Sequence, residues 1–370
     1  MTNYSTFPRT RNDQLNEPMF FGQNVNVARY DQQRYPQFEK LIEKQLSFFW
    51  RPEEVDLSMD RKDFLSMPAH EQHIFLSNLK YQILLDSVQG RSPNIALLPV
   101  VSLPELETWI ETWSFSETVH SRSYTHIVRN VLDHPDQVFN DIVENEEIIR
   151  RAEAVTAHYD TFITMVQEYQ LKGKPADRNL RRALMTLMAS VFILEGLRFY
   201  VSFACSFSFA ERAVMEGNAK IIKLIARDES LHKQGNQFMF QFWRSGRDDP
   251  EMKSVYEELK ADGTFDRLFD DAVKEETEWA DYLFKDGSMI GLSAPILKSY
   301  VAHIADNCRR QLGLERRYNG EHNPLPWMGA WLYSDKVQVA PQETEISSYL
   351  TGAVENDLSE ADFSGFSVSL

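Results

Sequence analysis

The sequence predicts an all-α protein built around a bundle of long helices. Apolar residues recur at helical spacing over several long segments, which is the pattern of amphipathic helices. Short alternating runs joined by Asn-Gly turns, the sign of β-hairpins, are weak throughout the chain. Prolines and serines also stand where such helices would begin. These three observations favour a helical bundle over a fold that contains a sheet.

The elements can be placed in order along the chain. Residues 1–35 have little periodicity and are expected to form an extended N-terminal arm. A helix should begin at Pro36, because proline suits the first helical position, and Pro52 should stop it. Further helices are expected around 142–169 and 265–284. Four long helices should carry function: one after Pro68 towards Gly90, one opening with a capping box at Ser102 and Glu105, one over 180–211 and one from about Gly217 into the 230s or 240s.

The C-terminal segment differs from the rest. No Lys or Arg follows Lys336, acidic residues are frequent, and apolar residues come singly. Such a composition buries little surface, so residues 337–370 are predicted to be a flexible acidic tail when free. Its scattered apolar anchors, such as Phe363 and Leu370, suit docking to a partner. The predicted organisation is therefore an arm (1–35), a helical-bundle domain (36–336) and a docking tail (337–370).

Composition excludes several classes of function. With 39 Lys and Arg against 55 Asp and Glu, the formal net charge is −16, so nucleic-acid binding is not expected. No uninterrupted apolar run approaches the roughly 18 residues of a membrane helix, and the first residues lack the apolar core of a signal peptide. The two cysteines, Cys205 and Cys308, form no disulfide framework and suit a reducing cytoplasm.

Each of the four long helices places a carboxylate on its apolar stripe. Two of them do so within a Glu-x-x-His pair, whose members lie on one helix face and so can hold one metal together. The six candidate ligands are Asp86, Glu117, His120, Glu195, Glu229 and His232. A buried ionised carboxylate without a partner costs at least several kcal/mol, and no matching Lys or Arg lies on these stripes. Two divalent cations would balance four carboxylates, and the oxygen and nitrogen donors favour iron or manganese.

A tyrosine accompanies the candidate metal centre. Tyr124 lies one helical turn after His120 and should therefore sit beside the metals without necessarily ligating them. Phe199, Phe203 and Ile225 follow the spacing of the other ligand helices and would give the tyrosine a dry pocket. Such a pocket is what a long-lived phenoxyl radical needs. Without a metal site, Tyr124 and the phenylalanines would instead be ordinary core residues.

Several segments resemble one known family, the small (beta) subunit of class Ia ribonucleotide reductase of the enterobacterial type. These include LLDSVQGRSPN, ETWSFSETVHSRSYTHI, LEGLRFYVSFACSF and LIARDESLH, and the likeness runs nearly from end to end. The resemblance implies a ferritin-like bundle that holds two iron ions as an oxo-bridged diferric centre, with a stable tyrosyl radical on Tyr124. Manganese is the alternative metal. Asp86, Glu117 and His120 would hold one ion, and Glu195, Glu229 and His232 the other.

The resemblance also implies roles for residues around the metals. Phe199, Phe203 and Ile225 would shield the radical, and Trp113 would contact a ligand carboxylate. Trp50 and Asp228, with His120, would form a buried electron-transfer chain that Tyr349 continues towards the large (alpha) subunit, which reduces ribonucleoside diphosphates. The tail would dock that subunit. A homodimer, together with O₂ and an electron donor for cofactor assembly, is also implied.

Three other functions remain open from the residues alone. A di-iron oxygenase or desaturase would use the same ligands but needs an open substrate cavity at the metals. An iron-storage or ferroxidase protein would usually be shorter and lack the acidic tail. A metal-free helical interaction protein would take up no metal. The chain has neither a phosphate-binding P-loop nor a dinucleotide-binding glycine motif, which fits a subunit that leaves substrate to another chain.

Overall fold

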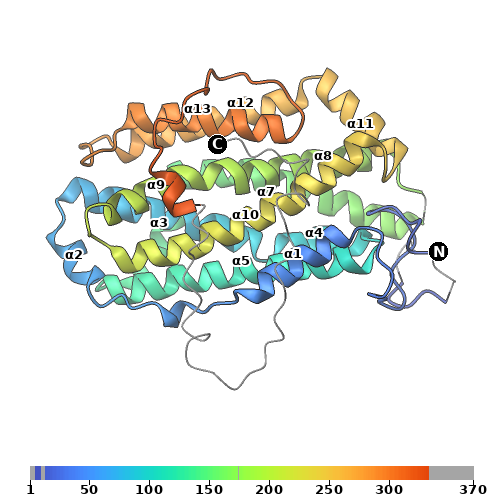
Figure 1. Cartoon of the computed structure of the whole chain (residues 1–370), viewed down its shortest axis with the longest axis horizontal. Helices are drawn as coiled ribbons and strands as arrows, with labels where there is room; N and C mark the ends of the chain where they lie inside the picture. Colours follow the sequence, from blue (N-terminus) through green and yellow to red (C-terminus); the bar gives the residue numbers. More distant parts are fainter. Residues whose placement is uncertain (1–4, 10–12, 174, 333–370) are drawn as a thin grey trace.

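The computed structural model describes residues 5–9, 13–173 and 175–332 (Figure 1). Regular structure within these residues is helical, apart from two isolated bridges, Phe20 with Val101 and Met289 with Leu292. The predicted all-α fold is confirmed. Its α-helices are α1 (Pro36–Ser47), α2 (Asp60–Ser66), α3 (Ala69–Gln89), α4 (Ser92–Leu97), α5 (Pro104–Val131), α6 (Pro135–Ile142), α7 (Glu146–Lys172), α8 (Arg178–Ile193), α9 (Phe199–Ala210), α10 (Glu216–Ser245), α11 (Pro250–Ala261), α12 (Thr264–Leu283), α13 (Ala294–Gln311) and α14 (Met328–Leu332).

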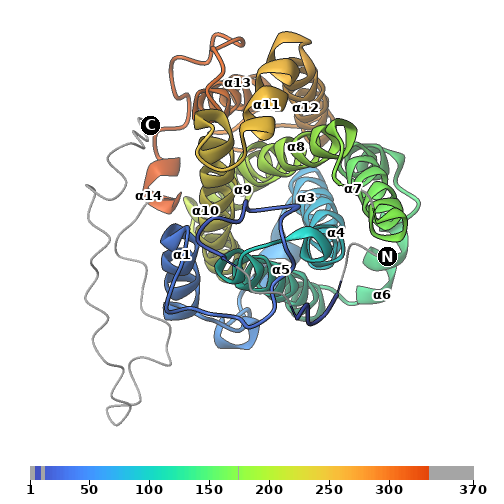
Figure 2. The ribbon, with the colours of Figure 1, turned by 90° about the vertical axis from the view of Figure 1, so that its right-hand side faces the viewer.

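Four of these helices close a ring around the centre of the bundle. Helix α3 packs against α5 and α9, and α10 packs against the same two helices from the other side. Helices α12 and α13 form a pair that covers α8 and α9, and α1 lies along α5 and α10 (Figures 1 and 2). The inner faces of the ring are therefore shielded on several sides by further helices.

Local sequence signals explain where many helices begin and end. Asn145 and Asp177 cap α7 and α8 by accepting backbone hydrogen bonds from residues two and three further on. Asp60 of α2 does the same for α10 from a distance, since its carboxylate accepts from the backbone N–H groups of Gly217 and Asn218. Helix α10 ends at Ser245 and is capped by Gly246, whose φ of 74° favours glycine.

The helix predicted at Pro36 begins there but ends at Ser47, before Pro52 is reached. The intervening residues leave the helical conformation, and Pro52 opens a short 3₁₀ turn, Pro52–Glu54. Trp50 therefore lies in a non-helical connection, where its side chain is directed by tertiary contacts and not by helix periodicity. Its ring is almost completely buried.

The predicted capping box at the start of α5 is wrong. The residue that caps α5 is Leu103, which makes no side-chain capping hydrogen bond. Ser102 instead accepts a hydrogen bond from the backbone N–H of Gly22, and Glu105 accepts one from the backbone N–H of Tyr35. Both side chains thus hold the N-terminal arm. Its residues 13–35 form turns and bends without helix.

The third long helix was predicted as one continuous α-helix over 180–211, but the structure interrupts it. Helices α8 and α9 are joined by a π-helical segment, Leu194–Arg198, which carries Glu195. The continuous helical run Arg178–Ala210 is long and apolar enough to cross a membrane by length and composition, although Glu195 and Arg198 interrupt its apolar residues. Its most apolar window is 94% buried inside the protein, however, so this run is the central helix of the core.

Candidate metal centre

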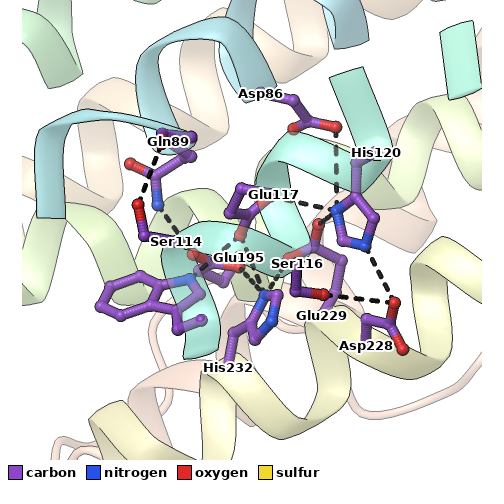
Figure 3. Close-up of polar contacts among 12 residues, drawn as sticks. Asp86, Gln89, Ser114, Ser116, Glu117, His120, Glu195, Asp228, Glu229 and His232 are labelled. Atoms are coloured by element: carbon purple, nitrogen blue, oxygen red, sulfur yellow. Dashed lines mark hydrogen bonds and ion pairs between the residues drawn. The ribbon is translucent and has the colours of Figure 1, made fainter. Parts of the chain in front are cut away.

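The ring of four helices brings the six predicted ligands together at its centre (Figure 3). Helix α3 supplies Asp86, the π-helical segment supplies Glu195, and α5 and α10 each supply a Glu-x-x-His pair. All six side chains are at most 1% exposed. Their ligand atoms fall into two groups, each of which lies within 4.8 Å: Asp86, Glu117, His120 and Glu229 in one, and Glu117, Glu195, Glu229 and His232 in the other.

The two groups share both glutamates of the Glu-x-x-His pairs. Glu117 presents Oε2 at 3.1 Å from Nδ1 of His120 and Oε1 at 2.9 Å from Nδ1 of His232. Glu229 likewise presents Oε1 at 3.2 Å from Nδ1 of His120 and Oε2 at 3.4 Å from Nδ1 of His232. The centre therefore has two adjacent positions for metal ions, with Glu117 and Glu229 between them. Asp86 belongs to the first position and Glu195 to the second.

Several buried polar atoms in the centre have no hydrogen bond. These atoms include both carboxylate oxygens of Asp86, both of Glu229 and one of Glu195. Buried polar atoms are nearly always paired, because leaving one unpaired costs free energy. Unpaired carboxylate oxygens beside two imidazole nitrogens are the donor set of a hard or intermediate divalent cation. The residues present therefore fit two such ions.

The pKa values of the ligand side chains also indicate a site for cations. Burial, and then the charge of Glu117, raise the pKa of Asp86 well above its usual value, and the pKa of Glu229 is raised for the same two reasons. Burial alone would lower the pKa of His120, but its hydrogen bonds to Asp228 and Glu117 raise it to about 10. Asp86 and Glu229 thus favour their protonated forms in this buried site, and bound cations would displace those protons.

A second layer of residues fixes the imidazole of His120. Its Nε2 lies 3.1 Å from Oδ2 of Asp228, while its Nδ1 faces the ligand carboxylates. When Nε2 donates to Asp228, Nδ1 keeps its lone pair for a metal. The indole Nε1 of Trp50 donates to the same Asp228 oxygen at 2.9 Å, and its ring stacks at 6.3 Å from that of His120. The structure thus brings Trp50, Asp228 and His120 into one contiguous contact.

Trp113 contacts a ligand carboxylate, since its Nε1 donates to Oε1 of Glu117 at 3.0 Å. Three further residues of this layer were missed from the sequence. Ser116 Oγ donates to Asp228 at 3.3 Å. Gln89 Nε2 donates to Oε1 of Glu195 at 2.7 Å, and its amide oxygen accepts from the hydroxyl of Tyr159 at 2.9 Å. Gln89 lies three residues after Asp86 on α3, so helix periodicity could have found it.

Tyr124 is completely buried on α5, one turn beyond His120. Burial, and then the negative charge of Asp86 beside its hydroxyl, raise its pKa well above the usual value. The phenol is therefore neutral and dry. Phe199, Phe203 and Ile225 are also fully buried, and the rings of Phe199 and Phe203 stack at 5.8 Å. Tyr349 and the rest of the predicted tail lie outside the described residues.

Comparisons with known proteins agree on one family. Residues 28–324 match the family model described as "Ribonucleotide reductase, small chain". The chain is 58% identical to the ribonucleoside-diphosphate reductase 1 subunit beta of Salmonella typhimurium, with 98% of this chain and 99% of that protein covered.

Solved structures share the fold. The ribonucleotide reductase R2 subunit from Clostridium botulinum superposes with a TM-score of 0.77 at 22% identity, covering 90% of this chain and 98% of that one. The dimanganese(II) NrdF of Streptococcus sanguinis does so with a TM-score of 0.66 at 20% identity, covering 83% and 99%. The extent and identity of the sequence match, together with the six-ligand centre, show that the chain belongs to the ribonucleotide reductase small-chain family.

Proposed function

We propose that the chain is the radical-generating small subunit of an aerobic ribonucleotide reductase. The observation that carries this proposal is the pair of adjacent ligand groups that share Glu117 and Glu229, one turn from a fully buried tyrosine. The curated relatives that the chain matches over nearly its whole length are ribonucleoside-diphosphate reductase beta subunits. The large subunit would then reduce ribonucleoside diphosphates to deoxyribonucleoside diphosphates.

In this proposal, Asp86, Glu117 and His120 hold one ion, and Glu195, Glu229 and His232 hold the other. When bound there, two ferrous ions would supply two of the four electrons that reduce O₂ to the level of water, and Tyr124 and an external donor would supply one each. Iron is the proposed metal. Manganese is the second candidate, because the same donor types suit both metals and a structural neighbour is a dimanganese(II) protein.

Tyr124 is proposed to carry the radical. Because its phenol is neutral, forming the neutral radical removes one electron and one proton from the same side chain. Dry surroundings protect a radical from quenching, and we assign this shielding role to Phe199, Phe203 and Ile225, which are all fully buried. The contact from His120 through Asp228 to Trp50 is the proposed start of the route by which the oxidising equivalent leaves. Tyr349 is proposed to receive it on the tail.

The remaining partners are proposals of the same kind. The acidic tail is proposed to dock the large subunit. A second copy of this chain is a further proposed partner, as the resemblance of the sequence to the family implies. A cytoplasmic location is supported by the two cysteines, which are both free and buried.

The test is electron paramagnetic resonance on metal-free protein given ferrous iron and then O₂, with Tyr124→Phe alongside. The parent should bind two iron ions and show an organic radical, and the variant should bind the same iron without that radical. The variant should also lose all turnover with the large subunit. Iron uptake without a radical in the parent would favour an oxygenase or storage function, and absence of iron uptake would remove the basis of the proposal.

A further inference from the structure

The π-helical segment that carries Glu195 is the least regular part of the ligand scaffold. A π-helix has hydrogen bonds between residues five apart, holds more residues per turn than an α-helix, and occurs as short insertions, frequently at functional sites. Leu194–Arg198 has this geometry between two ordinary α-helices, and all five of its residues are buried. Relaxation of this segment to α-helical geometry would change the direction in which Glu195 points.

The neighbouring helix α13 holds this segment through a cysteine. The thiol of Cys308 donates to the carbonyl oxygen of Gly196 at an S···O distance of 3.2 Å. Gly196 directly follows Glu195, so this contact is made on the backbone next to the ligand. A side chain at position 196 could not be accommodated easily, because its Cβ would lie 2.9 Å from Sγ of Cys308 and 2.9 Å from Cδ of Lys233. The glycine thus permits α13 and α10 to approach the segment.

A second anchor holds the other end of the segment. Arg198 forms an ion pair with Glu275 of α12 at 2.6 Å and lies 3.6 Å from Glu276. Glu276 in turn accepts a hydrogen bond from Tyr81 of α3 at 2.7 Å. This anchor is three residues beyond Glu195, whereas Cys308 acts one residue beyond it. Of these two contacts from other helices, the Cys308 thiol therefore acts on the residue nearer in sequence to the metal ligand Glu195.

From this geometry we infer that Cys308 is a positioning residue for the metal ligand Glu195, and that it acts through the Gly196 carbonyl. The inference rests on the proposed metal centre. Removing the thiol leaves a gap beside the carbonyl and takes away its sulfhydryl partner, so Glu195 is less well held in its binding orientation. The position that contains Glu195 and His232 should then bind metal more weakly than the position that contains Asp86 and His120.

The experiment is titration of the full-length metal-free protein with Mn²⁺ under argon, followed by electron paramagnetic resonance and calorimetry. The variants are Cys308→Ala, which lacks the donor, and Cys308→Ser, which keeps a hydroxyl donor. In Cys308→Ala, the affinity of one of the two sites should fall roughly fivefold to tenfold, near the lower limit for residues that orient metal ligands, because a thiol is a weak donor. Cys308→Ser should restore that affinity to within about twofold, since its hydroxyl can donate to the same carbonyl.

Cys205→Ala is the matched control, because Cys205 is the other buried thiol and lies on α9, outside the π-helical segment. It should lose a comparable amount of thermal stability and keep both parental affinities. Parental affinities in Cys308→Ala, or equal weakening of both sites in Cys308→Ala and Cys205→Ala, would overturn the inference and leave Cys308 as plain packing. Failure of the parent itself to bind two Mn²⁺ ions would contradict the proposed function instead.

Discussion

At the scale of single residues, the metal centre depends on the close approach of α5 and α10. Gly235 lies three residues after His232 on α10 and faces the indole of Trp109 on α5. A Cβ built at Gly235 would lie 2.7 Å from Cε2 of Trp109, and the Trp109 ring is 6.2 Å from the ring of His232. A methyl group at this position must therefore displace a side chain that packs beside a ligand.

Gly235→Ala should lower the free energy of unfolding by about 1–3 kcal/mol, the usual cost of overpacking a well-packed core. The direction of this change in the free energy of unfolding is informative, because alanine in a helix interior normally stabilises a protein relative to glycine by roughly 0.5–1 kcal/mol. Urea denaturation of the metal-free protein measures the change. Gly329→Ala in α14 is the control, because no atom lies within 4 Å of the added methyl group, and it should not destabilise the protein. Equal effects of the two changes would contradict the role of Gly235.

Only some residues of the metal centre could be predicted from the sequence. The two Glu-x-x-His pairs and Asp86 are visible because helix periodicity places them on apolar faces. Contacts between distant residues leave no such trace. Tyr159 reaches the centre only through Gln89, which is 70 residues away in the chain. The interactions of Trp50 likewise follow from a non-helical connection, so only the family resemblance indicated a role for it.

At the scale of elements, the difference between local patterns and contacts of distant residues explains the wrong predictions. The capping box failed because Ser102 and Glu105 accept from backbone groups of the arm, 80 and 70 residues earlier, and such partners compete with local capping. The π-helical segment could not be predicted from periodicity, because residues 187–209 are buried on every face and show no single apolar stripe that an inserted residue would displace. The helix start marked by Pro36 was placed correctly, since the proline effect is local.

The N-terminal arm is also held by the carboxylate of Asp248, whose pKa is raised. Asp248 accepts hydrogen bonds from the backbone N–H of Met19 at 2.9 Å and from the hydroxyl of Tyr35 at 3.0 Å. Burial raises its pKa to about 6, against 3.8 for an ordinary aspartate, although these hydrogen bonds lower it. The folded state therefore binds this proton more tightly than the unfolded state. Its stabilising effect is complete below about pH 4 and is lost as the pH rises through 6.

Asp248→Asn should remove this pH dependence, because an amide keeps an acceptor oxygen but does not ionise. Between pH 4 and 7 the free energy of unfolding of the variant should rise relative to the parent by roughly 2–3 kcal/mol. Urea denaturation of both proteins at several pH values gives this difference, and the titration of all other groups cancels in the comparison. A difference that stays constant with pH would show that Asp248 titrates normally.

At the scale of the whole molecule, the proposed function divides between the helical body and the tail. All proposed metal ligands and Tyr124 lie in the body, whereas Tyr349 and the acidic segment follow Lys336. Removing residues 337–370 should therefore leave two bound metals and the radical intact while abolishing binding to the large subunit. Electron paramagnetic resonance and surface plasmon resonance measure the two properties.

Tyr349→Phe in the full-length chain is the companion variant for this prediction. It should bind the large subunit normally and still fail to support turnover. Binding depends on the tail as a whole, whereas transfer of the oxidising equivalent depends on the phenol of Tyr349. Turnover by the truncated protein would show that the tail is not the docking segment. Loss of the radical on truncation would show instead that the tail also contributes to the cofactor.

The attachments of the N-terminal arm set an order for the formation of the molecule during translation. The arm is synthesised first, yet its partners are Ser102, Glu105 and Asp248, the last of which leaves the ribosome more than 200 residues after the arm. Met19, which is buried in the finished protein, therefore cannot make its hydrogen bond to Asp248 until the residues that follow α10 have been made.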